Sequence, residues 1–402
     1  MNLSALRRES EAMRDRIVAL RRDLHRHPEL AFEELRTAGI VAEALSALGY
    51  EVQTGVGKTG VVGVMEGERA TPHPHTLLIR FDMDALPIQE QVDVPFKSIY
   101  DGKMHACGHD AHTAIGIGVA ELLSRHRNQW GGIVKFVFQP AEEIVAGALA
   151  MIHDGVLERP KPDRVLSMHI WADEEVGVVG ITEGPALAAS GAFTITVRGR
   201  GSHGASPDLG VDPILASAHI VTALQSIVAR NVSPLRSGVV TVGSIHGGTA
   251  PNIIPDTVEM RGTVRAFEDG VMALLRERIV AITTAVAAAL GAQAQVVFSE
   301  HGTPATVNDP RMAELAREVA AQLPGVAHLR TDYRTMGAED CAYFLRAAPG
   351  AYLFVGAGNR ARGITEPHHS PRFQIDEEAL PLGVALMTAC ALRFLNDAPD
   401  VE

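Results

Sequence analysis

The sequence is poor in cysteine, and the cysteines that it has do not suit a disulfide scaffold. There are three in 402 residues, an odd number, and Cys107, Cys341 and Cys390 lie far apart. Proteins stapled by disulfides carry several closely spaced cysteines in a short secreted chain. The sequence therefore predicts a protein of the reducing cytoplasm, with Cys341 and Cys390 as inert residues of apolar helices.

Long apolar runs and clusters of positive charge are also missing. The sequence predicts no hydrophobic stretch of about 18 residues, the length that spans a bilayer, and therefore no membrane span. The N-terminal segment S-A-L-R-R-E-S-E-A-M-R-D lacks the apolar core of a signal peptide. The formal net charge is -12, without a long basic run, so we expect neither nucleic acid nor a membrane as a partner.

The length predicts two domains, because 402 residues exceed what one ordinary hydrophobic core organises. Short apolar runs that alternate with helical segments are typical of an α/β domain with buried strands. The expected strands cover 76–81, 132–138, 163–170 and 351–355, and the expected helices cover 3–24, 33–48, 111–125, 309–322 and 376–396.

The pattern changes near residue 187. Expected strands at 192–198, 239–245, 255–267 and 293–299 are combined with helices at 212–230 and 270–290. This β-α-β-β-α-β order is typical of a ferredoxin-like α+β domain. We therefore predict an α/β domain made of 1–186 and 300–402, with residues 187–299 inserted into it as a second domain.

A glycine-rich segment at 55–60, G-V-G-K-T-G, raises the question of nucleotide binding. A P-loop needs a glycine five residues before Gly57, where this chain has Val52. A dinucleotide-binding loop should open a helix, whereas this segment precedes the β-branched run 61–65. The sequence therefore argues against a nucleotide site.

The segment 104–112, M-H-A-C-G-H-D-A-H, concentrates thiol, imidazole and carboxylate groups. Cys107 and His109 are two residues apart and can point the same way from an extended or turning backbone. A thiolate with an imidazole suits zinc or a similar divalent ion. The alternative is a histidine-rich surface loop that binds nothing.

Carboxylates follow two of the expected strands, where sites on open α/β sheets gather. Asp82 and Asp84 follow the strand 76–81, and they project to one side if the segment stays extended. Glu142 and Glu143 follow the strand 132–138; one could bind metal while the other takes a proton from water. The alternatives are a solvated turn and a solvated pair that opens a helix.

Further imidazoles lie at His169, near the end of the strand 163–170, and at His368 and His369, before a proline-rich turn. His169 alone would favour a structural histidine, and the adjacent pair offers one more imidazole ligand. Together with the thiol, imidazole and carboxylate ligands above, they are enough for two divalent ions about 3.5–4 Å apart, as in metal-dependent hydrolases.

These segments resemble the M20 metallopeptidase family and, within it, the amidohydrolase branch of hippurate hydrolases, aminoacylases and auxin-conjugate hydrolases. They follow the family order over nearly the whole chain. The matching segments are H-R-H-P-E-L-A-F-E-E (25–34), D-M-D-A-L-P (82–87), M-H-A-C-G-H-D-A-H (104–112), F-Q-P-A-E-E (138–143), M-H (168–169), G-S-H-G-A-S-P (201–207), N-I-I-P-D (252–256), M-G-A-E-D (336–340) and H-H-S-P (368–371).

The resemblance implies two divalent ions, Zn²⁺ or Mn²⁺ with Co²⁺ as a third candidate, and a role for each matching residue. Glu142 matches the general base, and Asp84 matches the aspartate that orients a ligand or the base. His203 and Asn252 match substrate-binding residues of the inserted domain, which is also the usual dimer contact, so we expect a homodimer or a higher homo-oligomer through this domain. The implied metal ligands are Cys107, His109, Glu143, His169 and His369.

The expected reaction is hydrolysis of an N-acyl amino acid to a carboxylic acid and a free amino acid, with His203 as a donor to the oxyanion. A metallocarboxypeptidase, a dipeptidase or a deacetylase of N-acetyl-diaminopimelate type would use the same residues. A thiol hydrolase with Cys107 as nucleophile is the alternative from another class, and it would survive chelation. A non-catalytic metal-binding or interaction protein is a further alternative, but Glu142 would have no role in it.

Two segments depart from the family pattern. Asp208 follows Pro207 where many relatives have histidine, and the stretch I-W-A-D-E-E after His169 places the negative charges of Asp173, Glu174 and Glu175 near the expected site. These differences bear on the identity of the substrate rather than on the chemistry.

Overall fold

The computed structural model describes residues 2–72, 74–300 and 302–397. The chain forms two compact units, each with its own hydrophobic core. Unit 1 contains Met1–Ala186, Val307–Arg334 and Asp340–Glu402, and unit 2 contains Leu187–Thr306 and Thr335–Glu339. Unit 2 therefore includes 302–306 and Thr335–Glu339, which lie outside the range 187–299 expected for the inserted domain.

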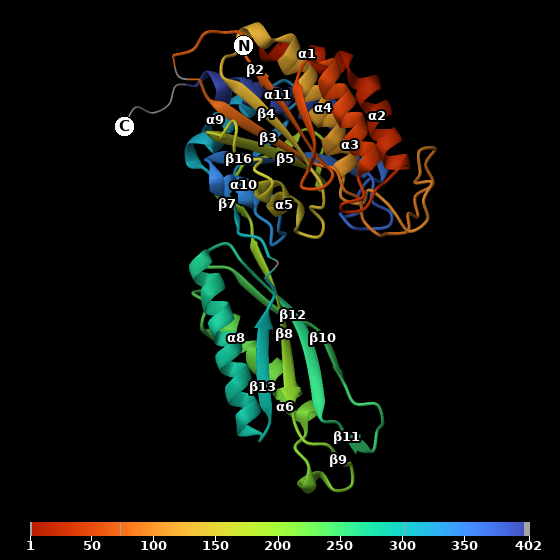
Figure 1. Ribbon diagram of the computed structural model, residues 1–402, viewed down its shortest axis with the longest axis vertical. Helices are drawn as coiled ribbons and strands as arrows, with labels where there is room; N and C mark the ends of the chain where they lie inside the picture. Colours follow the sequence, from red (N-terminus) through yellow and green to blue (C-terminus); the bar gives the residue numbers. More distant parts are fainter. Residues whose placement is uncertain (1, 73, 301, 398–402) are drawn as a thin grey trace. The chain divides into compact units, whose positions relative to one another are not determined.

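A mixed eight-stranded sheet forms the centre of unit 1 (Figure 1), and the predicted α/β class is confirmed. The strand order is β1-β2-β4-β3-β5-β16-β6-β15, with β4, β3, β5 and β16 parallel. Strands β3 and β16 are buried along their whole length, as expected where both faces of a parallel sheet are covered. The bounds are β1 Glu51–Val56, β2 Gly60–Glu66, β3 Thr76–Asp82, β4 Ile133–Gln139, β5 Arg164–Glu175, β6 Val178–Gly180, β15 His328–Arg330 and β16 Gly350–Gly358.

Helices of unit 1 cover this sheet, and α4 and α11 pack against each other and against β3 and β5. The segment predicted as one N-terminal helix is two, because the N–H of Met13 donates to the carbonyl of Ser10, three residues back, in a tighter turn. The bounds are α1 Leu3–Ala12, α2 Arg14–Arg26, α3 Leu35–Ala47, α4 His109–Arg125, α5 Gly147–His153, α9 Pro310–Gln322, α10 Ala342–Ala347 and α11 Ala379–Asn396, with short 3₁₀ turns η1 Arg127–Gln129 and η3 Arg360–Arg362.

Two helical segments of the described chain are long and apolar enough to cross a membrane by length and composition alone, Pro213–Arg230 and Ala379–Asn396. The expectation that no apolar stretch reaches this length is therefore wrong. The second segment is α11, and 89% of it is buried inside the protein. A helix that is apolar on all sides is also what the core of a large domain requires, so the criterion alone does not identify a span.

Unit 2 contains a four-stranded antiparallel sheet with the order β10-β12-β8-β13. Buried and more exposed residues alternate along β8 and β12, which shows that one face of this sheet packs on the helices. The bounds are β8 Ala189–Arg198, β9 Ser202–His203, η2 Pro207–Leu209, α6 Pro213–Leu224, α7 Ser226–Arg230, β10 Gly238–Gly247, β11 Ile253–Ile254, β12 Thr257–Ala266, α8 Asp269–Ala289 and β13 Gln293–Phe298. The remaining short strands are β7 Gly184–Leu187 and β14 Thr306–Asn308.

Candidate metal centre

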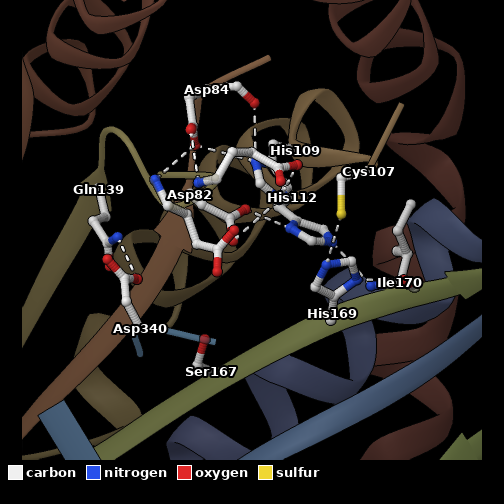
Figure 2. A network of polar contacts seen from close by, with 12 residues as sticks. Asp82, Asp84, Cys107, His109, His112, Gln139, Ser167, His169, Ile170 and Asp340 are labelled. Atoms are coloured by element: carbon white, nitrogen blue, oxygen red, sulfur yellow. Dashed lines mark hydrogen bonds and ion pairs between the residues drawn. The ribbon is translucent and has the colours of Figure 1, made fainter. Parts of the chain in front are cut away.

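Neighbouring parallel strands bring most of the predicted ligands to one edge of the sheet in unit 1. Strand β3 ends at Asp82, the chain reaches Glu143 shortly after β4 ends, and β5 carries His169. The side chains of Asp82, Cys107, His109 and His169 gather around one point, as Figure 2 shows. The carboxyl ends of parallel strands thus form the site, as they do in other open α/β sheets.

A glycine separates the thiol from the first imidazole at the start of α4. Gly108 has a φ of 89°, a left-handed conformation that glycine adopts without strain. A Cβ at this position would lie 2.5 Å from the Cδ1 atom of Ile170. The tight turn therefore requires glycine, and it places Cys107 and His109 beside the same strand end.

Ligand-type atoms of unit 1 form four overlapping groups, and within each group the atoms lie within 4.8 Å of one another. The Sγ of Cys107 is 3.5 Å from the Nε2 of His169, and the Nε2 of His369 is 3.3 Å from the Oε2 of Glu143. His368, in contrast, accepts a hydrogen bond from the N–H of Ala172 at 3.1 Å. The groups are Cys107–His109–His169, Asp82–His109–His112, Cys107–Glu143–His369 and His109–Glu142–Glu143.

Hydrogen bonds decide which nitrogen of each buried histidine faces this cluster. His109 donates from Nδ1 to the carbonyl of Asp84 at 2.9 Å, and His169 donates from Nδ1 to the carbonyl of Ile170 at 2.5 Å. A carbonyl only accepts, so Nδ1 carries the proton in both rings. Each ring therefore turns Nε2 toward the cluster, the arrangement that metal-binding histidines show when an outer partner holds Nδ1.

Asp84 also fixes the loop that carries the two glutamates. Its Oδ1 accepts the N–H of Glu142 at 3.1 Å, and its Oδ2 accepts the N–H of Glu143 at 3.0 Å. The same carboxylate lies 3.3 Å from the Nδ1 of His109. A buried charge with two backbone donors is strongly held, so Asp84 couples the position of His109 to that of the glutamate loop.

Two buried atoms of the cluster have no hydrogen-bond partner among the described residues, the Nε2 of His109 and the Oε1 of Glu143. An unsatisfied buried polar atom costs about 1–3 kcal/mol unless something binds it. Thiolate, imidazole and carboxylate together form a donor set suited to zinc and related divalent ions. The residues therefore fit a divalent metal ion.

The electrostatics of the cluster favour a bound cation. Burial raises the pKa of Glu143 to about 7 despite the opposing effect of His109, and the charge of Asp84 adds to the rise. Burial alone would lower the pKa of His109, but Asp82, Asp84 and Glu143 outweigh it and raise this pKa to about 10. Burial holds the pKa of His169 well below its usual range, which favours the neutral ring. A divalent ion would offset the mutual repulsion of these carboxylates.

A buried ion network that the sequence analysis did not foresee supports the strand ends. Arg80 is fully buried and contacts Asp82 at 2.7 Å, Gln139 at 2.8 Å and Asp340 at 3.1 Å. Asp340 also accepts the N–H of Ala148 at 3.0 Å. The arginine inside the apolar run T-L-L-I-R-F could have predicted this network, because a charged residue in a buried strand needs a partner of opposite charge.

The sequence also matches a known protein family. The sequence pattern of peptidase family M20/M25/M40 matches residues 78–393. The chain belongs to this family. The predicted resemblance is thereby confirmed, and so is the expectation of a hydrolase that acts on amide or peptide C–N bonds.

Individual members of the M20 family are similar over nearly the whole chain. Thermostable carboxypeptidase 2 of Saccharolobus solfataricus is 39% identical, over 97% of this chain and 98% of the relative. N-acetylcysteine deacetylase of Bacillus subtilis is 40% identical, over 96% and 98%. The crystal structure of the Bacillus subtilis YXEP protein, a dinuclear metal binding peptidase of the M20 family, is 35% identical with a TM-score of 0.84, over 96% of this chain and all of that one.

The remaining two residues predicted for the site of this M20 enzyme lie together in unit 2. Strands β9 and β11 pair so that His203 is opposite Ile253, and the N–H of Gly204 donates to the carbonyl of Asn252 at 2.7 Å. Both His203 and Asn252 are exposed. The pairing therefore brings the backbones of His203 and Asn252 close together in one short two-stranded sheet.

Proposed function

We propose that this M20 enzyme is a metal-dependent amidohydrolase that converts an N-acyl amino acid to a carboxylic acid and a free amino acid. The observation that carries the proposal is the set of overlapping ligand groups beside Glu142, in which two buried atoms lack a hydrogen-bond partner. The similarity to an N-acetylcysteine deacetylase supports this substrate class. The similarity to a dinuclear metal binding peptidase supports two divalent ions.

The proposed metal ligands belong to the overlapping groups. When bound, divalent ions polarise a carbonyl and lower the pKa of water. The thiol favours Zn²⁺, while Mn²⁺ and Co²⁺ remain candidates because affinity order alone does not decide which metal a cell loads. The five ligands are Cys107, His109, Glu143, His169 and His369.

The side chains of the protein would then move one proton and orient the substrate. Glu142 takes a proton from the attacking water and delivers it to the leaving nitrogen as the amide C–N bond breaks and the new C–O bond forms. Asp84 holds the backbone of Glu142 in place. We assign His203 to the developing oxyanion and Asn252 to the substrate.

We also propose that the two units divide the work. Unit 1 would be the catalytic domain, and unit 2 would be an inserted domain of ferredoxin-like type that covers the substrate and forms the contact of a homodimer. The sheet order and the β-α-β-β-α-β sequence of unit 2 support the ferredoxin-like assignment. None of the three cysteines, all within the described residues, forms a disulfide, which supports a reducing compartment such as the cytoplasm.

A carboxypeptidase is the second candidate function, and the similarity to thermostable carboxypeptidase 2 favours it. The same proposed ligands and Glu142 would serve both reactions, because both hydrolyse an amide bond. The two candidates differ in what lies on the acyl side of that bond, an isolated acyl group or the rest of a peptide.

Free amino acid released from a panel of N-acyl amino acids and peptides, with and without a chelator, tests the proposal. Benzoylglycine, N-acetylmethionine, N-acetylcysteine and dipeptides would form the panel. We expect chelator-sensitive release that is restored by Zn²⁺ or Mn²⁺ and is fastest with N-acyl amino acids. Faster release from peptides would favour the carboxypeptidase. Chelator-resistant release that iodoacetamide abolishes, or no release after metal is added, would contradict a metal-dependent amidohydrolase.

Aromatic side chains next to His169 support an apolar acyl group. Trp171 lies two residues from His169 on β5, so both point to the same face of the strand. The ring centroid of Trp171 is 5.3 Å from that of His169 and 6.0 Å from that of Tyr333. Aromatic residues are only 5% of the chain, so two half-buried aromatic rings beside a proposed metal ligand could set the preference for the acyl group. We propose that an aromatic acyl group packs on these rings.

Replacing Trp171 by alanine should lower kcat/KM for benzoyl amino acids by about 10–100-fold, because the lost ring contact is worth about 1–3 kcal/mol. Acetyl amino acids should change less than about threefold. The measurement is kcat/KM for both substrates, with metal content as a check on His169. Trp171→Phe is the matched control, since it keeps an aromatic ring. Equal losses with both acyl groups would contradict the proposed packing.

A further inference from the structure

His112 lies directly behind the candidate metal centre, and none of the proposed ligand roles uses it. It is fully buried on α4, one turn after His109. Its ring meets that of His169 edge to face, with 4.4 Å between the ring centroids. Figure 2 shows it between Asp82 and Ile170, which belong to two different strands.

Two hydrogen bonds fix the protonation of this imidazole. The N–H of Ile170 donates to the Nε2 of His112 at 2.9 Å, so that nitrogen carries no proton. The Nδ1 of His112 lies 2.5 Å from the Oδ1 of Asp82 and therefore donates to it. Arg80 in turn binds the other oxygen of Asp82. His112 is thus locked as one tautomer between β3 and β5.

The backbone of Ile170 connects His112 to His169. Its N–H is held by His112, and its carbonyl accepts the Nδ1 proton of His169. This second bond leaves the Nε2 of His169 facing the Sγ of Cys107 at 3.5 Å. The orientation of a proposed ligand therefore depends on a backbone segment that a second histidine holds.

We infer that His112 is a positioning residue for His169, which it keeps in the tautomer and orientation that present Nε2 to a divalent ion. The inference rests on the proposed function, because it takes His169 as a metal ligand. Outer partners of metal-binding histidines typically change metal affinity by 10–100-fold when they are removed. A histidine that only fills the core would affect stability without this change in affinity.

Two amide substitutions separate the two hydrogen bonds of His112. The amide of Asn reaches the place of Nδ1 and can keep the bond to Asp82, whereas the amide of Gln reaches the place of Nε2 and can accept the N–H of Ile170. If His112 positions His169 through the backbone of Ile170, H112N should weaken the binding of Co²⁺ by about 10–100-fold. The affinity of H112Q for Co²⁺ should stay within about threefold of the wild type. Co²⁺ titrated into the metal-free protein, followed by its visible absorption, measures both.

A second readout needs no metal. Hydrogen exchange of the metal-free protein, measured on a peptide that contains Ile170, should be faster in H112N than in H112Q, because only Asn releases this N–H. Ser167→Ala is the control, since Ser167 also lies on β5 and donates to the carbonyl of Arg80 at 3.0 Å. It should lower stability and leave the affinity for Co²⁺ unchanged.

The outcomes distinguish this inference from the proposed function. Wild-type protein that binds no Co²⁺ would overturn the metal centre itself. Wild-type protein that binds Co²⁺, with equal affinities in H112N and H112Q, would overturn the positioning role. Should H112N fail to fold, a folded H112Q with strongly weakened binding would also overturn it, because that variant keeps the bond to Ile170.

Discussion

Replacing Glu142 by glutamine should lower kcat by about 10²–10⁴-fold while the protein keeps its metal. Glutamine has the size of glutamate but cannot take a proton from water, and this is the share of the rate that general acid–base catalysis typically supplies. Glu142 is buried and lies with His109 and Glu143 in one of the groups of ligand atoms. Its backbone N–H is held by Asp84, so the substitution should leave the loop in place.

The neighbouring glutamate offers a matched control. Glu143→Gln changes the same functional group one residue away, but it removes a proposed metal ligand whose buried Oε1 accepts no hydrogen bond among the described residues. We expect this variant to lose both activity and bound metal, whereas Glu142→Gln loses activity alone. Turnover and metal content of the two purified variants check the difference. Near-normal turnover in Glu142→Gln would show that another group moves the proton.

Replacing Arg80 by methionine should reduce the free energy of unfolding of unit 1 by about 3–5 kcal/mol. Arg80 is fully buried, and its guanidinium contacts Asp82 and Asp340, which are also buried. Removing one partner of a buried ion pair leaves uncompensated charge in the interior, and this penalty exceeds the value of the pair itself. Both tryptophans, Trp130 and Trp171, belong to unit 1, so tryptophan fluorescence during urea unfolding reports on this unit.

An exposed ion pair of the same unit provides the contrast. Lys103 contacts Glu33 at 2.9 Å, with 32% and 59% of the two side chains exposed. Lys103→Met should therefore change the free energy of unfolding by less than about 1 kcal/mol, because water already solvates both charges. If Arg80→Met were no more destabilising than Lys103→Met, the buried network would not support the strand ends.

The sequence alone determined the residue types of the candidate centre and their places at the ends of strands. Buried parallel strands appear as short apolar runs, so the segments that follow β3 and β4 could be located from the pattern. The close spacing of Cys107 and His109 then indicated a metal-binding turn, and the M20 segments added a role for each residue. Each of these features is a pattern of nearby residues, so it can be recognised in the sequence without a three-dimensional structure.

The predictions that failed concern boundaries and burial. The N-terminal helix divides at Met13 because one turn is tighter than an α-helical turn. No residue type in this segment predicts that change. The apolar helix α11 exceeds the expected length limit, and only its surroundings show that it is a core helix. The break in the N-terminal helix depends on one backbone hydrogen bond within a single turn, and the burial of α11 depends on the elements that surround it. Hydrophobic periodicity along the chain reports neither of these.

Only the tertiary structure decided how the candidate residues are held. It places His369 beside Glu143 and turns His368 toward the N–H of Ala172. The contact of Arg80 with Asp340 joins residues 260 positions apart, and the tautomer of His112 depends on the backbone N–H of Ile170. Every residue except proline has such an N–H, so sequence cannot say which one will meet a histidine. That choice is made by the packing of β3, β5 and α4, which only the folded chain brings together.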